Sequence, residues 1–414
     1  MFKKLETIQK TPTLLSFGKC KPMFEFKEKI KDGGLTREQR LQIEAGNKYY
    51  KGKLRRQGSY YSLDKWKKDF EQSQHFKKNI CEFPSIDFYK TRQNCFRKGF
   101  DDSQNIRSLL AGLDFLLAEM GKRAMKAVLY LNNSWEWSGG YGYYLEQAGM
   151  GKAPRPNEVG YEAYMRHVAQ FADNERAHQL FYDYVRFIIG RQNRYTSLYY
   201  KDDPTIMAWQ IGNEPRAFGD ALKQPFAKWL SQASALIRQL DPNHLISVGG
   251  EGIWGCEMDS TLYAQISGDP NIDYLTAHVW PYNWSWVRPD SLLADVPKAC
   301  KNTADYLRPH FNLARQLQKP LVIEEFGFPR DNFSFSPSST TVARDQYYSY
   351  VFSLVKNEPT VSGCNFWAWG GEARPQHEQW LPGDPYMGDP AQEQQGLNSV
   401  FSSDSTTLGV VNRE

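Results

Sequence analysis

The sequence alternates short apolar segments with amphipathic helical segments, and this alternation restricts the fold more than any other feature. Six apolar segments lack the polar alternation of a half-exposed strand, which favours strands buried on both faces of a parallel sheet. They end at residues 131, 214, 248, 279, 325 and 369. Helical apolar spacing occurs within 109–120, 161–171, 176–189, 226–240, 260–266, 303–317 (interrupted at Pro309) and 343–354. Strands separated by helices in this way predict successive parallel βα units.

Two of the predicted strands end at a glutamate. The first runs into Asn213-Glu214-Pro215 and the second into Glu324-Glu325-Phe326-Gly327. Alone, Glu214 could be an ordinary turn residue, with Pro215 ending the strand. Because side chains alternate along a strand, we expect only one of Glu324 and Glu325 to reach a shared site. Two carboxyl groups at strand ends fit a retaining glycosidase, which needs a proton donor and a nucleophile about 5 to 5.5 Å apart.

Composition narrows the function classes. The 12 Trp and 24 Tyr residues supply aromatic faces, which pack in protein cores and also stack on sugar rings. No segment approaches the roughly 18 to 20 apolar residues of a membrane span, so we expect none. The six cysteines are scattered without a Cys-x-x-Cys pair, and the seven histidines show no ligand spacing. We therefore expect no metal, no disulfide framework and no cofactor, and we expect a monomer.

The charge is uneven along the chain. The net charge is +4, but residues 1–100 hold 24 Lys and Arg against 11 Asp and Glu. These basic residues follow no nucleic-acid motif, so we interpret them as a solvated surface and expect no nucleic-acid partner. Residues 1–105 show no clear strand, even at Ile80-Cys81-Glu82-Phe83. We therefore divide the chain into an atypical basic region, residues 1–105, and a barrel domain, residues 106–414.

A set of motifs in the second region points to one family. In chain order they are Leu131-Asn132-Asn133-Ser134-Trp135-Glu136-Trp137-Ser138-Gly139-Gly140, Asn213-Glu214-Pro215, Leu240-Asp241-Pro242-Asn243-His244-Leu245, His278-Val279-Trp280-Pro281, Glu324-Glu325-Phe326-Gly327 and Phe366-Trp367-Ala368-Trp369-Gly370. Together they resemble glycoside hydrolase family 5, and most closely its endo-β-1,4-mannanase branch. The resemblance covers about residues 106–414. It implies a (β/α)8 TIM barrel whose first two strands are not legible in this sequence.

The resemblance also implies roles for single residues. Glu214, after the fourth barrel strand, looks like the acid/base, and Glu325, after the seventh, looks like the nucleophile. Asn213 would hold the sugar 2-hydroxyl. His278 and Trp280 would lie beside the nucleophile and the reacting sugar.

Three further tryptophans are implied to contact the sugar. Trp367 would be the platform under the sugar at the cleavage site, and Trp135 and Trp137 would line the glycone side. Without the resemblance, Trp367 would be read as core packing and a lone His278 as a buried structural histidine. The remaining acidic candidates are expected to be salt-bridge or hydrogen-bond partners, namely Glu136, Glu251 and Glu324.

The N-terminal quarter departs from the family pattern. The second strand of the family carries an arginine that supports the nucleophile, and the nearest arginines before Ile106 are Arg92 and Arg97, neither of which ends a plausible strand. Six strands alone cannot close an eight-stranded barrel. Either residues 1–105 supply two strands that the sequence does not reveal, or this region is a replaced or frame-shifted product. We favour the second interpretation.

The resemblance implies a retaining endo-β-1,4-mannanase acting on mannan, galactomannan or glucomannan. In this role Glu214 should have a raised pKa as the acid while Glu325 stays ionised. Two alternatives remain, a related barrel β-glucanase or cellulase, and a non-catalytic glycan-binding barrel. Such mannanases are generally secreted or periplasmic, but no signal peptide is legible here, so the location stays unknown.

Overall fold

The computed structural model describes residues 80–84, 104–136, 140–381, 384–385, 387–390 and 393–413. Its strands are β1 (Ile80–Pro84), β2 (Lys126–Tyr130), β3 (Ile206–Gln210), β4 (Leu245–Ser247), β5 (Leu275–Val279), β6 (Leu321–Phe326), β7 (Val361–Phe366), β8 (Trp369–Gly371) and β9 (Val400–Phe401). Its α-helices are α6 (Gln104–Lys122), α7 (Gly140–Gln147), α8 (Pro156–Val159), α9 (Tyr161–Val168), α10 (Glu175–Ile189), α11 (Lys223–Leu240), α12 (Ser260–Ser267), α13 (Leu292–Leu317), α14 (Val342–Asn357) and α15 (Ser405–Arg413). Within these described ranges, no helix combines the length and the apolar character that crossing a bilayer requires.

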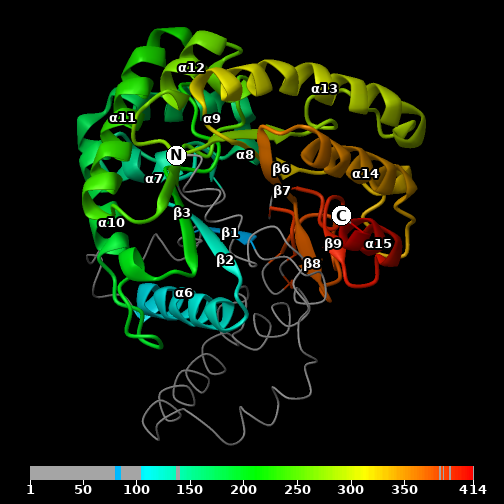
Figure 1. Cartoon of the computed structure of the whole chain (residues 1–414), viewed down its shortest axis with the longest axis horizontal. Coiled ribbons are helices and arrows are strands. Elements are labelled where there is room, and N and C mark those ends of the chain that lie inside the picture. Colours follow the sequence, from blue (N-terminus) through cyan, green and yellow to red (C-terminus); the bar gives the residue numbers. More distant parts are fainter. Residues whose placement is uncertain are drawn as a thin grey trace, which may run out of the picture.

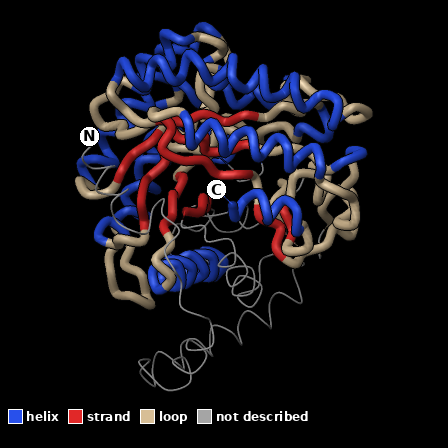
Figure 2. The backbone as a smooth tube through the Cα atoms, turned by 45° about the vertical axis from the view of Figure 1, so that its right-hand side comes forward, coloured by secondary structure: helices blue, strands red, loops and turns tan. Residues whose placement is uncertain are grey.

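Strands β1 to β7 run parallel and follow one another in chain order. One hydrogen-bonded sheet contains β1, β2, β3 and β4, and another contains β5, β6 and β7. The N–H groups of Asp273 and His278 donate to the carbonyls of Ile246 (2.8 Å) and Glu251 (3.1 Å), which connects the two sheets. Helices α10 to α14 lie outside the strands (Figure 1), and Figure 2 shows the strands enclosed by helices. This is the arrangement of a (β/α)8 barrel.

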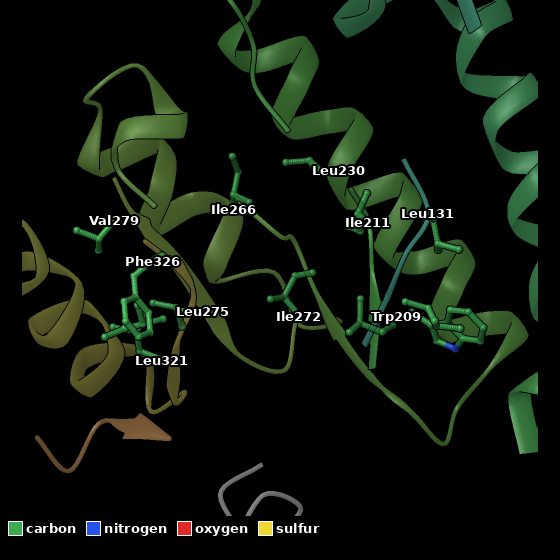
Figure 3. Packing of buried hydrophobic residues seen from close by; sticks show 14 of the residues in the cluster. Leu131, Trp209, Ile211, Leu230, Ile266, Ile272, Leu275, Val279, Leu321 and Phe326 are labelled. Carbon is green, nitrogen blue, oxygen red and sulfur yellow. The ribbon is translucent and has the colours of Figure 1, made fainter. Parts of the chain in front are cut away.

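The two faces of the strands have different surroundings. One large apolar core lies between the strands and the helices, and it contains Trp209 of β3 together with Leu230 of α11 (Figure 3). A smaller apolar cluster comes from the other face of the strands, and its members are Val128, Ala208, Leu245 and Tyr274. Because neighbouring residues of a strand point to opposite sides, this second cluster fills the inside of the barrel. The barrel interior is thus packed with side chains below the ends of the strands.

The structure corrects the sequence prediction at one point in the N-terminal quarter. Residues Ile80–Pro84 form β1, which pairs in parallel with β2 from Ile80 opposite Lys126 to Pro84 opposite Tyr130. A five-residue segment carries too little pattern to identify itself, and its conformation depends on the neighbouring strand. Arg92 and Arg97 lie outside the described residues. The division at residue 105 and the replaced N-terminal region therefore stay predictions.

Most of the predicted helices and strands occur within a few residues of their expected positions. The predicted interruption at Pro309 is wrong, because α13 is one continuous helix that contains both Pro297 and Pro309. Both prolines are exposed, and a helix can bend at its solvent side at little cost to its packing. The sequence analysis did not predict α7, α8, α15, β8 and β9, which are short segments without a clear apolar period.

Candidate active site

The ends of β3 and β6 bring Glu214 and Glu325 together, although they are distant in the sequence. One carboxylate oxygen of each, and a ring nitrogen of His278, all lie within 4.8 Å of one another. A separation of about 5 to 5.5 Å lets one carboxylate attack the sugar carbon, whereas inverting glycosidases need about 6.5 to 9.5 Å to place a water. The structure thus assembles the two carboxylates that the sequence singled out, at the spacing of a retaining site.

The backbone and the side chain of Glu214 are both held by neighbours. Its N–H donates to the carbonyl of Gly249 at 2.8 Å, and its φ of 47° lies in the left-handed region. Such a conformation costs a non-glycine residue about 1 to 3 kcal/mol, so the surrounding contacts must maintain it. The carboxylate accepts hydrogen bonds from Nε1 of Trp135 at 2.5 Å and from Nδ1 of His278 at 2.9 Å. These contacts fix the direction in which Glu214 faces the site.

Glu325 reaches the site because β6 is irregular. Ile323 pairs with Ala277 of β5, but the next pair joins His278 to Glu325 and leaves Glu324 out. This additional residue is a β-bulge, which locally breaks the alternation of side chains. Of the two residues, Glu325 groups with Glu214 and His278 within 4.8 Å, whereas Glu324 lies on the other side of the imidazole ring; that only one of them enters the shared site stays a prediction. Both approach the ring of His278, with N–O distances of 3.9 Å for Glu324 and 3.4 Å for Glu325.

The two carboxyl groups differ in the donors around them. Burial would raise the pKa of Glu214, but the hydrogen bond and charge of His278 and the charge of Arg216 lower it. Burial and the negative charges of Glu214 and Glu324 raise the pKa of Glu325 to about 8. Its nearest donors, Nε1 of Trp280 at 3.3 Å and His278 at 3.4 Å, are too distant to offset this. This reverses the sequence prediction, which placed the higher pKa on Glu214. With this order of pKa values, Glu325 holds the proton that the two carboxyl groups share. Catalysis needs that proton on Glu214, so one proton must move from Glu325 to Glu214.

Trp280, Trp367 and Asn213 lie where the sequence predicts a sugar-binding surface. The rings of Trp280 and Trp367 are 6.3 Å apart between centres and inclined by 72°, so they form a corner next to Glu325. Asn213 is buried at the end of β3, and its side-chain amide donates a long hydrogen bond of 3.4 Å to Oδ1 of Asn133. Their sugar contacts stay predictions.

Trp135 has a contact that the sequence did not predict. Its indole N–H donates to Glu214, and its ring stacks with Tyr164, with 6.4 Å between centres. Trp135 therefore positions the carboxylate, in addition to any contact with a sugar. Trp137 lies outside the described residues, so its predicted position on the glycone side is not tested.

Arg216 is a neighbour of the site that the sequence analysis did not identify. Its Nε donates to Oε2 of Glu251 at 2.5 Å, and its guanidinium lies 5.3 Å from the ring centre of Trp135. Glu251 is thus a salt-bridge partner, as predicted. Burial raises its pKa to about 7, although the charge of Arg216 opposes this. The sequence offered one indication that Arg216 lies near the site, namely its position two residues after Glu214.

The segment after β8 also approaches the site. Burial and the nearby charges of Asp389, Glu214 and Glu136 raise the pKa of Glu393 to about 8. The buried guanidinium of Arg344 donates to three carbonyls, two of them in this segment. The segment is therefore fastened to the barrel, and it brings a further carboxyl group toward the acid/base candidate.

A carboxylate–imidazole cluster could in principle hold a cation. Within the described part of the chain, Glu214, His278 and Glu325 form the group whose potential ligand atoms are close enough. However, Nδ1 of His278 is already engaged by Glu214. Two carboxyl groups at this distance hold a proton between them without an ion, because both cannot easily be charged at once. The close approach of these groups therefore fits a shared proton without requiring an ion.

Comparison with known proteins decides the family. The profile of the GH family 5 beta-mannosidase-like group matches residues 99–414. The chain belongs to glycoside hydrolase family 5. The crystal structure of a family 5 mannosidase from Rhizomucor miehei superposes with a TM-score of 0.72 at 31% identity, covering 83% of this chain and 85% of that chain. The family and the (β/α)8 barrel expected from the sequence are thereby confirmed.

Relatives of this family 5 chain include plant enzymes named for mannan. Mannan endo-1,4-beta-mannosidase 7 of Arabidopsis thaliana is 27% identical over 271 residues, which are 63% of this chain and 59% of that protein. Mannan endo-1,4-beta-mannosidase 4 of Solanum lycopersicum is 26% identical over 316 residues, 72% of each chain. The chain thus spans about 59% of the length of the Arabidopsis relative. The endo-beta-1,4-mannanase of Thermotoga petrophila shares the fold, with a TM-score of 0.63, 22% identity, and coverage of 86% and 73%.

Proposed function

We propose that this family 5 protein is a retaining endo-β-1,4-mannanase, which hydrolyses internal bonds of mannan, galactomannan or glucomannan. The observation that carries the proposal is the approach of Glu214 and Glu325 to within 4.8 Å, which fits a double displacement. The names of the plant relatives support mannan as the substrate.

The reaction would proceed in two steps. Glu214 first donates a proton to the glycosidic oxygen while Glu325 attacks the anomeric carbon, so the bond to the leaving chain breaks as the glycosyl–enzyme bond forms. Glu214 then takes a proton from a water molecule, which attacks the same carbon and releases Glu325. The N–H groups of Trp135 and Trp280 face these two carboxylates and orient them.

One observation favours a second candidate, an exo-acting β-mannosidase. The charges of Glu214 and Glu136 help to raise the pKa of Glu393, and a segment close enough to act on the acid/base candidate would leave less room for a long polymer. The solved relative from Rhizomucor miehei is described as a mannosidase, and one of its crystals is a complex with mannosyl-fructose. An exo enzyme would remove single mannose units from chain ends.

Product analysis on soluble galactomannan and on mannotriose tests the proposal and separates the two candidates. An endo enzyme lowers the viscosity early and releases a mixture of oligosaccharides, whereas an exo enzyme releases mannose with little loss of viscosity. Hydrolysis of carboxymethyl-cellulose in preference to galactomannan would instead indicate a β-glucanase. Galactomannan binding without hydrolysis would identify a non-catalytic glycan-binding barrel. Either of these last two results would overturn the proposal.

The carboxyl pair predicts the pH dependence of the reaction. Groups this close titrate as a pair, so the pKa of about 8 belongs to the last proton that Glu214 and Glu325 share. The reaction needs this proton on Glu214. We therefore expect kcat/KM to fall about tenfold per pH unit above about pH 8, and to fall again at acid pH when both groups are protonated. Initial rates between about pH 4 and 10 check this, and a rate that still rises above pH 8 would contradict it.

A further inference from the structure

The carboxylate of Glu324 lies inside the barrel, next to the candidate catalytic pair. Val322 and Ala208, two residues before Glu324 and Gln210, pack in the inner apolar cluster. Since every second residue of a regular strand faces the same side, Gln210 occupies the following inner layer, and its contact with Glu324 places that carboxyl group beside it despite the bulge. Nε2 of Gln210 donates a hydrogen bond to Oε2 of Glu324, and Glu324 is only 2% exposed. A carboxyl group is therefore enclosed directly behind the site.

His278 lies between Glu324 and the site. Its Nδ1 lies 2.9 Å from Oε1 of Glu214 and 3.4 Å from Oε2 of Glu325. Its Nε2, on the opposite edge of the ring, lies 3.9 Å from Oε2 of Glu324. In the described part of the chain these three carboxylates face the ring, and Glu251 acts on it from the loop after β4. The ring is 1% exposed, so these groups, and not bulk water, determine its protonation.

We propose that Glu324 is a positioning residue, which through His278 fixes the protonation and orientation of the imidazole that Glu214 and Glu325 share. The inference rests on the proposed hydrolase function. A carboxylate opposite Nε2 favours a ring that carries hydrogen on both nitrogens and so keeps Nδ1 as a donor to the site. Without it, a neutral ring could carry its single hydrogen on Nε2. Nδ1 would then turn a lone pair toward the carboxylate of Glu214, which would repel it.

Packing alone does not account for the charge of Glu324. A glutamine would have the same shape at a lower cost of desolvation. Among the described residues, neither Oε1 of Glu324 nor Nε2 of His278 has a hydrogen-bond partner. Burial raises the pKa of Glu324, and His278 opposes this. Burial likewise opposes a charged His278, but the surrounding carboxylates raise its pKa well above the usual value. Among the neighbours that favour a charged Glu324, His278 acts more strongly than Tyr274 and Gln210, so the main interaction of this charge is with the ring.

The substitution Glu324→Gln tests the proposal, because it removes the charge and keeps the shape. We expect kcat on galactomannan to fall about 10- to 100-fold, by analogy with the range found when the partner that orients a metal-binding histidine is removed. KM should change less than about threefold, since Glu324 does not reach the substrate. The alkaline limb of kcat/KM should move down by about one pH unit, because a nearby negative charge has been lost.

Asp241→Asn is the matched control. Asp241 is also fully buried and holds a histidine, accepting from Nδ1 of His244 at 2.6 Å and from Nε1 of Trp209 at 2.7 Å. It follows α11 and precedes β4, at the end of the strands opposite to the site. This variant should be less stable but keep its kcat and its alkaline limb. If Glu324→Gln does not fold, Gln210→Met removes the donor to Glu324 instead. This variant should also lower kcat and move the alkaline limb of kcat/KM down.

Two further measurements separate failure of this proposal from failure of the proposed function. If the wild type hydrolyses galactomannan, a Glu324→Gln variant with the wild-type kcat and alkaline limb overturns the positioning role alone. If the wild type hydrolyses neither galactomannan nor carboxymethyl-cellulose, the protonation of the His278 ring can still be followed by ¹⁵N NMR. We expect Nδ1 of His278 to carry hydrogen at neutral pH in the wild type. In Glu324→Gln, the titration midpoint of the His278 ring should fall by about one pH unit. An unchanged ring titration would overturn the proposal.

Discussion

Replacing Glu325 with glutamine should reduce kcat on galactomannan by roughly 10⁴-fold or more, the scale found when an enzyme loses its nucleophile. An amide cannot attack the sugar carbon, so no glycosyl-enzyme forms. The fold should be retained, because glutamine has the same shape and the hydrogen bond that Glu325 accepts from Trp280, within the described part of the chain, is a long one of 3.3 Å. Reducing-end release by the purified variant, measured at high enzyme concentration, checks this.

A surface carboxylate provides the control for this substitution. Glu162 of α9 has a side chain that is 82% exposed and pairs with Arg166 one turn away. Glu162→Gln should keep the wild-type rate, because an exposed pair contributes little. A Glu325→Gln protein that hydrolyses galactomannan at a rate near that of the wild type would mean that the nucleophile is a different residue.

Removing the carboxylate of Asp114 should lower the free energy of unfolding by about 3 to 5 kcal/mol. The side chain of Asp114 is fully buried in α6 and accepts two hydrogen bonds from Arg191, at 2.9 and 2.6 Å. It also accepts from the hydroxyl of Tyr200 at 2.7 Å and from Nε of Arg194 at 3.2 Å. Asp114→Ala leaves the largely buried guanidinium of Arg191 without its partner, and an uncompensated charge of this kind is strongly destabilising.

Thermal and urea unfolding measure this effect. The expected loss corresponds to a fall in Tm of roughly 3 to 6 °C for a chain of 414 residues, because the entropy of unfolding grows with chain length. Asp183→Ala is the comparison, because Asp183 is 51% exposed and pairs with Arg186 at 3.1 Å, and such pairs contribute less than about 1 kcal/mol. If both variants unfold like the wild type, the contacts of Asp114 with the 191–200 segment do not stabilise the barrel.

Local pattern was sufficient to predict most of the barrel. The apolar run that leads to Glu214 and the run that leads to Glu325 are strands in which nearly every residue is buried. Uninterrupted apolar runs are readable because a strand enclosed on both faces tolerates few polar residues. β1 could not be predicted in this way, because its five residues become a strand by pairing with β2.

The sequence by itself determined the succession of βα units and the two glutamates at strand ends, since both follow from spacing along the chain. Only the tertiary structure decided how those glutamates are surrounded. The bulge in β6 depends on pairing with β5, and it turns Glu324 toward His278 together with Glu325. The order of the two pKa values likewise depends on donors from distant segments, Trp135 and Arg216 beside Glu214. Burial and electrostatic neighbours are properties of the folded chain, so no local pattern encodes them.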